Sequence, residues 1–197
     1  NTPGIESNNV QALLVDRAGV LWIGTHGGGL TRYHEGRFTH TSTRDVLPDA
    51  RVRCLYEDRL GALWVGTDDG IATIRDGEVT VHSTASGLPG DQIEAITGDA
   101  TGGVWVGTLS GLAQLRDGRW TTYTTRDGLA ANTIRALAWD PVGGLWVGTD
   151  AGMSRFHDGL FSTYGPAHGA KAVEVPAILV DHYGTVWAGT VGDGLYR

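Results

Sequence analysis

Short runs of β-branched, aromatic and other apolar residues alternate with turn residues along the whole chain. Residues 93–132 show one repeat, in which the runs IEAITGD, VWVGT, LAQLRDG and RWTTYTT are separated by turns such as ATGG and LSG. Runs of this length, bounded by Gly or Asp-Gly, are typical of β-strands joined by hairpins. No segment keeps a helical period over ten residues. Each repeat therefore predicts a meander of four antiparallel strands.

The repeat recurs with a nearly constant period. Five tryptophans are spaced 41 or 42 residues apart, each six residues after an aspartate and three after a glycine. A four-stranded meander repeated at this spacing is typical of β-propeller blades. We therefore predict an all-β fold, a β-propeller of about five repeats with the last blade incomplete. The predicted blades of this single domain are approximately 8–50, 51–91, 92–132, 133–174 and 175–197.

The repeated residues are interpreted as scaffold, because an active site is not expected in every blade. The Asp and Gly close the hairpin between the first two strands, where Asp bonds nearby backbone and Gly takes a positive φ. The Trp lies on the second strand, where it wedges between neighbouring blades. This structural set comprises Trp22, Trp64, Trp105, Trp146 and Trp187, with Asp16, Asp58, Asp99, Asp140 and Asp181, and with Gly19, Gly61, Gly102, Gly143 and Gly184.

Composition and charge exclude several classes of partner. The formal net charge is −7 without any charge run, which disfavours binding to a phosphate backbone, so we predict no nucleic-acid partner. No stretch has the apolar length of a membrane span, so we predict no membrane insertion in this segment. The seven histidines are out of register and no Cys-rich ligand set occurs, so neither a metal nor another cofactor is expected. The single cysteine, Cys54, shares its register with alanines and is interpreted as a small buried residue.

The pattern D-x-x-G-x-[LV]-W-[IVA]-G-T, followed by DG-x-[FW]-[TS] and DGL, resembles the two-component regulator propeller repeat over nearly the whole chain. Arrays of such repeats form the extracytoplasmic sensor parts of bacterial regulators, often hybrid histidine kinases. The resemblance implies a sensory role in the periplasm, frequently towards glycans. It also implies a piece of a longer array, since family members commonly carry more repeats. The sequence departs from the pattern in the closing loop GPAHGAKAVEV and in the missing fourth strand of the last repeat.

Residues that differ between blades are the candidates for a binding site. In a propeller, the loop into each first strand and the loop between the second and third strands open on the same face. Carboxylates, amides and arginines at this mouth suit a small polar or oligosaccharide ligand, although they are also compatible with a merely solvated rim. The candidate ligand-binding residues are Gln11, His26, Arg53, Asp68, Asp69, Glu94, Asn132, Arg135 and Asp150. Trp139, which has no aromatic counterpart, either packs as a plug at the far end of the channel or offers a surface for stacking a sugar.

Three functions remain open from the sequence. The favoured hypothesis is a non-catalytic propeller that binds a ligand and transmits a signal. The second is a scaffold that self-associates or joins the remaining blades of a larger propeller, because the last strand would expose an unpaired edge. The third is an enzyme, a propeller lyase or lactonase with Glu94 and His26 as the reacting pair. We predict that the chain is not an enzyme.

Overall fold

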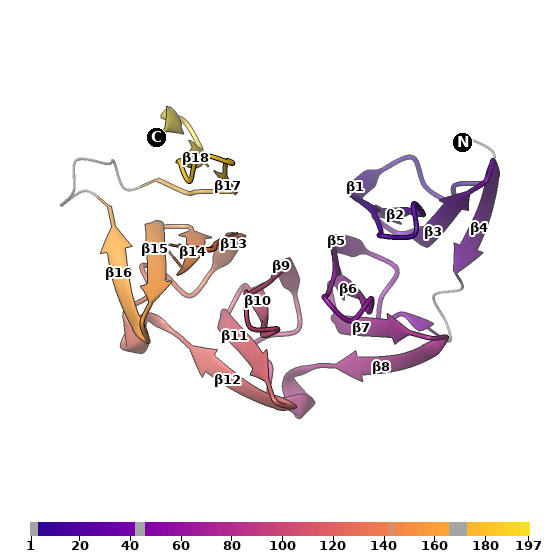
Figure 1. The fold of residues 1–197 in the computed structure, drawn as a ribbon, viewed down its shortest axis with the longest axis horizontal. Coiled ribbons are helices and arrows are strands. Elements are labelled where there is room, and N and C mark those ends of the chain that lie inside the picture. The colour runs from indigo at the N-terminus through magenta and orange to yellow at the C-terminus, as the bar shows by residue number, and fades with distance from the viewer. Residues whose placement is uncertain (1–3, 42–45, 143, 166–172) are drawn as a thin grey trace. The chain divides into compact units, whose positions relative to one another are not determined.

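The computed structural model describes residues 4–41, 46–142, 144–165 and 173–197. It confirms the predicted fold class, because these residues form an all-β propeller of antiparallel sheets, four of them with four strands and one with three (Figure 1). Two short 3₁₀ helices, Thr84–Ser86 and Thr125–Asp127, each follow the fourth strand of a sheet. The predicted hairpin glycine Gly143 and most of the divergent closing loop lie outside the described residues.

The strands of each sheet are consecutive in sequence. The first sheet contains β1 (Val10–Val15), β2 (Leu21–Thr25), β3 (Gly29–His34) and β4 (Arg37–Thr41). The second contains β5 (Val52–Glu57), β6 (Leu63–Thr67), β7 (Gly70–Arg75) and β8 (Glu78–His82). The third contains β9 (Ile93–Gly98), β10 (Val104–Thr108), β11 (Gly111–Arg116) and β12 (Arg119–Tyr123). The fourth contains β13 (Ile134–Asp140), β14 (Gly144–Thr149), β15 (Gly152–His157) and β16 (Leu160–Tyr164). The fifth contains β17 (Ala177–Val180), β18 (Val186–Thr190) and β19 (Gly194–Tyr196).

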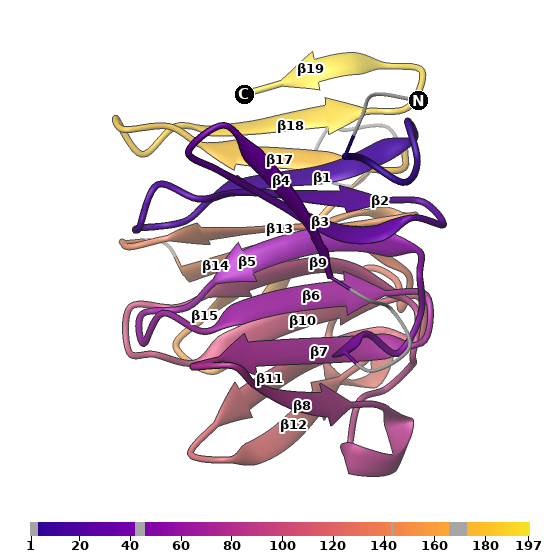
Figure 2. The same ribbon diagram turned by 90° about the vertical axis from the view of Figure 1, so that its right-hand side faces the viewer.

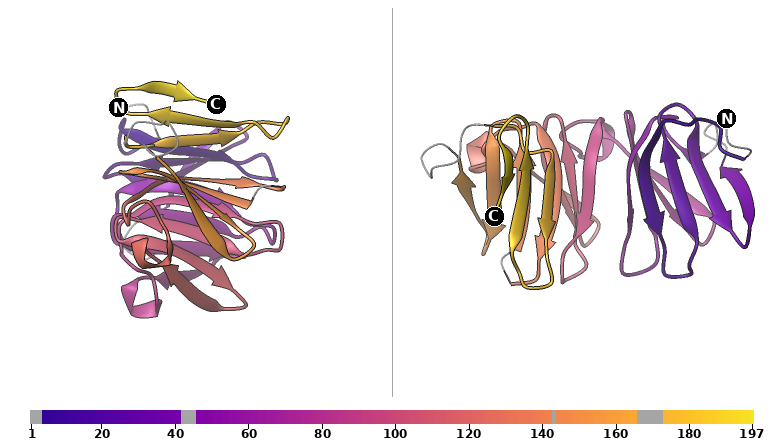
Figure 3. Two further views of the ribbon diagram at one scale, coloured as in Figure 1. Left: turned by 90° about the vertical axis from the view of Figure 1, so that its left-hand side faces the viewer. Right: turned by 90° about the horizontal axis from the view of Figure 1, so that it is seen from above.

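The chain divides into two compact units, Asn1–Ile96 and Thr97–Arg197, and the division falls within β9. In the first unit, β5 to β8 lie side by side in Figure 2, and the indigo and violet strands β1 to β4 do so in the right-hand view of Figure 3. The second unit contains β10 to β19. Because each unit is compact by itself, the assignment of all 197 residues to a single domain stays a prediction.

The repeated aspartate closes the first hairpin of the sheet and also anchors the tryptophan. In the first sheet, Asp16 Oδ1 accepts hydrogen bonds from the amides of Ala18 and Val20, both at 2.9 Å. Its other oxygen accepts from Trp22 Nε1 at 2.8 Å. One side chain therefore fixes the turn and orients the large aromatic residue. The same Trp–Asp bond recurs in three other sheets, as Trp64–Asp58, Trp105–Asp99 and Trp187–Asp181.

The fourth sheet departs from this arrangement. Trp146 Nε1 is buried without a hydrogen-bond partner among the residues that the structure describes. The guanidinium of Arg155, on the neighbouring strand, lies 5.3 Å from the centre of the Trp146 ring. A cation over the ring face is attracted to the aromatic quadrupole. The fourth tryptophan is thus held by packing and by Arg155 rather than by its aspartate.

Each unit has its own apolar core, made of residues that alternate along the strands. In the second unit, the ring of Trp105 lies 5.1 Å from that of Phe156 on the following sheet, as expected for a Trp that wedges between blades. The core cluster of the first unit includes Leu30, Leu47, Val52, Leu63, Val65 and Ala72. That of the second includes Trp105, Leu112, Leu129, Ile134, Leu145 and Val147.

Neighbouring sheets meet through a branched aliphatic side chain that covers a glycine, and we call this contact a junction. In the second unit, a Cβ atom added to Gly107 on β10 would lie 2.5 Å from Ile134 Cγ2 on β13. In the first unit, a Cβ atom on Gly66 would lie 2.7 Å from Ile93 Cγ2. A glycine is required here because no side chain fits beneath the neighbouring sheet. Gly24 lies beneath the side chain of Val52 in the same way. At Gly148 the closest atom to an added Cβ is the backbone oxygen of Val175, and Val175 Cγ1 is at 3.2 Å.

Candidate functional site

A cluster of charged side chains in the first unit surrounds Arg53. Arg53 lies on β5, and its Nε donates a hydrogen bond to Asp68 Oδ1 in the turn between β6 and β7. Its Nη1 atom lies 3.3 Å from Glu94 Oε1 on β9. The side chains of Arg53, Asp68 and Glu94 are 29%, 12% and 14% exposed. This burial leaves the charges only partly solvated, so their mutual contacts are stronger than those of surface ion pairs.

A second arginine extends the cluster. Arg51 Nε lies 3.0 Å from Asp49 Oδ1 and 3.0 Å from Asp68 Oδ2. Burial opposes ionisation of Asp49, but the Arg51 side chain and amide donate hydrogen bonds that outweigh it and lower the pKa of Asp49. The hydrogen bond to Asp68 raises the pKa of Arg53. Two arginines thus face three carboxylates, Asp49, Asp68 and Glu94, which leaves a net charge of −1.

The second unit contains a similar cluster of one arginine and two carboxylates, in which the carboxylates are more exposed. Arg135 Nε lies 2.6 Å from Asp150 Oδ1 and 3.2 Å from Glu174 Oε1. Arg135 and Asp150 are fifteen residues apart, as are Arg53 and Asp68, so the two pairs occupy the same positions in their repeats. Asp150 and Glu174 are 39% and 37% exposed, about three times the exposure of Asp68 and Glu94 in the first unit. The second cluster is therefore closer to a surface ion pair.

The remaining candidate residues serve local structure in the described contacts. Gln11 Nε2 donates to Asn9 Oδ1 at 2.6 Å, and His26 forms an isolated β-bridge with Arg51. Asn132 Oδ1 accepts from the Thr125 amide at 2.8 Å and so closes the turn after β12. The Asp69 amide donates to Thr67 Oγ1 at 3.2 Å. The structure therefore brings together Arg53, Asp68 and Glu94 in the first unit, and Arg135 with Asp150 in the second.

Arg51, Asp49 and Glu174 complete these clusters but are not among the candidates predicted from the sequence. Arg51 stands two positions before Arg53, on the far side of a register shift between Val52 and Cys54. Arg51 lies just before β5, which begins at Val52, so it is absent from the first-strand positions that supply the candidates. Glu174 follows the divergent closing loop, where the repeat pattern is interrupted. Its repeat position, equivalent to that of Arg51, is the signal that could have identified it.

The groups around Arg53 show no arrangement for nucleophilic or metal-assisted chemistry. Burial raises the pKa of the Cys54 thiol to about 12, so this thiol is a poor nucleophile. Glu94 is engaged by Arg53 and also accepts from Gln92 Nε2 at 3.5 Å. Within the described ranges, no group of three or more His, Cys, Asp or Glu side chains could hold a metal ion.

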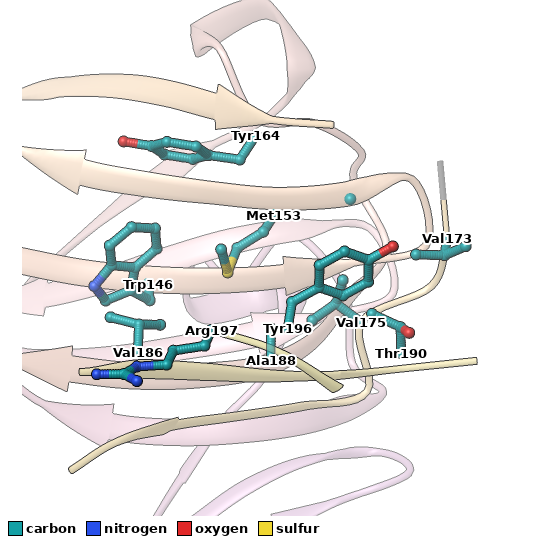
Figure 4. Close-up of a pocket in the computed structure, with 11 residues that line it drawn as sticks. Trp146, Met153, Tyr164, Val173, Val175, Val186, Ala188, Thr190, Tyr196 and Arg197 are labelled. Atoms are coloured by element: carbon teal, nitrogen blue, oxygen red, sulfur yellow. The ribbon is translucent and has the colours of Figure 1, made fainter. Parts of the chain in front are cut away.

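An apolar hollow of about 330 Å³ lies in the second unit, between the fourth and fifth sheets. Figure 4 shows Trp146 and Met153 on one side of it, facing Val186 and Ala188. One repeat earlier the positions equivalent to Val186 and Ala188 carry the larger Leu145 and Val147, so the smaller side chains contribute to the hollow. It lacks the charged pairs of the Arg53 cluster and is better interpreted as a loosely filled junction than as a polar-ligand site.

Trp139 packs against the core cluster of the second unit, in agreement with its interpretation as a packing residue. It also borders a hollow of about 390 Å³ that includes Gln114 and Arg116. A hollow of about 350 Å³ occurs at the equivalent place in the first unit, where Glu57 takes the position of Trp139. Because the hollow recurs between successive sheets, its presence is a property of the repeat.

Comparison with known proteins agrees with the geometry. The sequence model of the two component regulator propeller family matches residues 4–27, 46–69 and 128–151. Three segments of the chain thus match the two component regulator propeller repeat. No curated protein sequence matches the chain. No helix in the described part of the chain is long and apolar enough to cross a membrane.

Among solved structures, the extracellular domain of a putative hybrid two component system from B. thetaiotaomicron has a TM-score of 0.83 and 24% identity. The match covers 94% of this chain and 27% of that one, so the chain spans about a quarter of its length. A virginiamycin B lyase from Staphylococcus aureus gives a TM-score of 0.78 at 16% identity, covering 100% of this chain and 72% of that one. A gluconolactonase from Xanthomonas campestris gives 0.64 at 17%, covering 94% and 70%. At these identities the likeness shows the propeller fold.

Proposed function

We propose that this chain is a non-catalytic, ligand-binding part of a bacterial sensor, and that its ligand is a small neutral polyhydroxylated molecule held at the Arg53 cluster. The observation that carries the proposal is the partly buried network of Arg51, Arg53, Asp49, Asp68 and Glu94. It is built from positions that vary between repeats, whereas the repeated Asp, Gly and Trp residues form the hairpin turns and the packing of the sheets.

The charge balance of the cluster favours a neutral ligand over an anion. Its arginines already face three carboxylates, and the net charge of −1 adds to the acidic balance of the whole chain. An anion would have to compete with Asp68 and Glu94 for Arg53 and would be repelled by them. Hydroxyl groups can instead donate to the carboxylates and accept from arginine N–H groups. Sugars combine both capacities.

The sensory and extracytoplasmic parts of the proposal are supported by the repeat family and by the extracellular domain of a hybrid two component system that shares the fold. They belong to the whole regulator, of which such a propeller forms a part. The signal would pass from the ligand to an output domain elsewhere in the protein. The lyase and lactonase among the solved structures share the fold as well. The engagement of Glu94 by Arg53 is our reason for preferring binding over turnover.

The proposal can be tested by titration calorimetry with D-glucose, D-galactose, maltose and xylobiose as neutral probes, and with D-glucuronate as the anionic contrast. We expect saturable binding of at least one neutral probe, no consumption of it, and weaker or no binding of glucuronate. The Arg53→Ala and Arg53→Lys variants should lose this binding, and Arg119→Ala on exposed β12 is the matched control. Failure of every neutral probe to bind, or unchanged binding by both Arg53 variants, would contradict the proposal.

A further inference from the structure

The hollow of about 390 Å³ between the third and fourth sheets lies wholly within the second unit, and we call it the Trp139 hollow. A hollow at this place is a property of the repeat, but the side chains that line it differ. The equivalent hollow of the first unit contains Arg32 and Glu57. In the second unit those two positions carry Gln114 and Trp139. Two charged side chains are thus replaced by an amide and an aromatic ring.

Aromatic rings form much of the wall of the Trp139 hollow. Trp139, Leu145 and Phe156 are cross-strand neighbours on β13, β14 and β15, so their side chains share one face of the fourth sheet. Trp105, on the third sheet, also lines the hollow, and its ring lies 5.1 Å from that of Phe156. In the other repeats, the positions equivalent to Trp139 carry Val15, Glu57, Gly98 and Val180. The hollow of the second unit is therefore distinguished by its aromatic character.

The charged groups at the inner wall of the hollow neutralise each other. Asp99 Oδ2 accepts hydrogen bonds from Arg116 Nη2 at 2.7 Å and from Gln114 Nε2 at 3.3 Å. Burial opposes ionisation of Asp99, but the hydrogen bonds that it accepts, with that from the Thr101 side chain the strongest, outweigh burial and lower its pKa to about 2. Asp99 is therefore ionised at neutral pH and balances the charge of Arg116.

Two residues that line the hollow keep unused hydrogen-bonding capacity. Gln114 is only 9% exposed, and its amide nitrogen must face Asp99, because a carboxylate can only accept. Its carbonyl oxygen has no hydrogen-bond partner among the described residues. Arg116 uses Nη2 for Asp99 and Thr101, and its Nε and Nη1 atoms make no hydrogen bond within the described ranges. The hollow thus offers an acceptor and a donor beside aromatic rings.

We propose that the Trp139 hollow binds a neutral planar heterocycle with a lactam edge, that is, an N–H group next to a carbonyl group. The ring packs on Trp139 and Phe156, and its N–H donates to the carbonyl oxygen of Gln114. The carbonyl of the ligand accepts from the guanidinium of Arg116. Pyrimidine and purine bases such as uracil and hypoxanthine carry this edge. A concave, half-aromatic hollow of this volume with a few polar groups is typical of small-molecule sites.

The lining of the hollow disfavours anions and sugars. Asp99 already neutralises Arg116, and Asp158 at the rim, 88% exposed, adds a negative charge that repels an anion. A sugar carries hydroxyl groups around its whole ring, and those that face Trp139, Phe156 and Val142 would lose water without gaining a partner. The charged Arg53 cluster suits a sugar better. Binding of a heterocycle in the second unit does not depend on the function proposed for that cluster.

The experiment is a titration followed through the indole N–H signals of a ¹H–¹⁵N NMR spectrum. The chain has seven tryptophans, and the signal that is absent from the spectrum of Trp139→Val belongs to Trp139. Valine stands at this position in the first and fifth repeats, so the repeat accommodates it. Gln114→Thr introduces the residue of the second repeat, Thr73, and leaves the ring of Trp139 in place. Circular dichroism and the melting temperature verify that each variant is folded.

The probes are uracil and hypoxanthine, with two contrasts. The compound 1,3-dimethyluracil keeps the ring and its carbonyl groups but has no N–H donor. D-glucose is a neutral sugar, so it separates this site from the Arg53 cluster. Trp120→Phe is the matched control variant, because it also removes a tryptophan and because phenylalanine stands at this position in the first and fourth repeats.

We expect uracil or hypoxanthine to shift the Trp139 signal saturably, and 1,3-dimethyluracil to bind about tenfold more weakly. By calorimetry, Gln114→Thr should weaken binding of the heterocycle about tenfold, Trp139→Val should abolish it, and Trp120→Phe should bind as the wild type does. D-glucose should leave the Trp139 signal in place, whether or not it binds elsewhere. The proposal is overturned if neither heterocycle moves this signal, if D-glucose moves it, if 1,3-dimethyluracil binds as tightly as uracil, or if both site variants bind normally.

Discussion

The Arg53 cluster of the first unit and the Arg135 cluster of the second share the repeat positions of the arginine and the aspartate, but their glutamates stand at different repeat positions and their carboxylates differ in burial. Both join an arginine on a first strand to an aspartate fifteen residues later and to a glutamate of the next repeat. The carboxylates are 12% and 14% exposed in the first cluster, and 39% and 37% exposed in the second. The same types of charged group are thus more shielded from water in the first cluster than in the second.

The comparison shows that the register of the repeat determines which arginine and aspartate form an ion pair. The neighbouring residues determine how buried, and therefore how strong, that ion pair is. In the first unit, Arg51 adds a second cation that contacts Asp68 at 3.0 Å. At the equivalent place in the fourth repeat stands Thr133, which brings no charge to the Arg135 cluster. The first cluster is therefore held together by more charged contacts, and the second serves as its control.

The largest expected effect is a difference in the free energy of unfolding between the Arg53→Ala and Arg135→Ala variants. Arg53→Ala leaves Asp68 and Glu94 partly buried without their main cation and should lower the free energy of unfolding by about 2 kcal/mol. Arg135→Ala removes a more exposed pair and should cost about 0.5 kcal/mol. Urea unfolding at neutral pH measures both. Equal losses for the two variants would show that the difference in burial has no energetic consequence.

Replacing each arginine by lysine should sharpen the comparison. Lysine keeps the charge but cannot bring separate N–H groups of a planar fork to Asp68 and Glu94, so Arg53→Lys should cost about 1 kcal/mol. Arg135→Lys should be close to neutral, because its contacts with Asp150 and Glu174 both come from Nε and are exposed. The check is again urea unfolding. A neutral Arg53→Lys would mean that charge alone matters at the first cluster.

Salt should affect the second cluster more than the first. Screening acts on exposed charges, so raising the NaCl concentration from about 0.05 to 1 M should remove most of the ~0.5 kcal/mol lost in Arg135→Ala. The loss in Arg53→Ala should persist, because partly buried charges are screened less. Unfolding of wild type and both variants at the two salt concentrations tests this. Parallel salt dependence of the two variants would remove the distinction.

The smallest expected effect is a pH dependence that belongs to the first cluster. Asp49 has a pKa below its ordinary value of 3.8 in the folded chain, so its contribution to stability is present above that value. This contribution is lost as the pH falls through the lowered folded pKa. Arg51→Ala should remove the partner that lowers the pKa, and its stability deficit should shrink as the pH falls from 6 to 3. A deficit that is constant over this range would exclude Asp49 as the titrating group.

The fold could be predicted from the sequence because each repeat shows the same pattern of apolar runs and turn residues, so each one indicates the same strands independently. In residues 93–132, the four runs seen in the sequence coincide with β9, β10, β11 and β12. The 3₁₀ turn Thr125–Asp127 was not predicted, since three residues are too short for a period to show. The bond from Trp22 Nε1 to Asp16 was also missed, although the constant spacing of six residues is its signature.

The candidate site could be predicted only in part. Arg53, Asp68 and Glu94 stand out as residues that differ between repeats, but their mutual contacts depend on the bulge between Val52 and Cys54. Such a bulge changes the direction of side chains, and the alternation of apolar residues in the sequence does not reveal it. Arg51 was missed because it lies just before β5 and is not one of the first-strand positions. Binding by Gln11, His26, Asp69 and Asn132 stays a prediction.

The junction between sheets also determines which changes in length the chain can tolerate. In each of the four described junctions, Val or Ile of one repeat covers a glycine of the repeat before it, so the contact joins two different copies of the motif. Gain or loss of one complete repeat of 41 residues would recreate the same interface at the new boundary, whereas a partial repeat would place the Val or Ile opposite a side chain. Because the glycine must lie opposite the Val or Ile, a gene for such a protein can gain or lose length by duplication only in whole repeats.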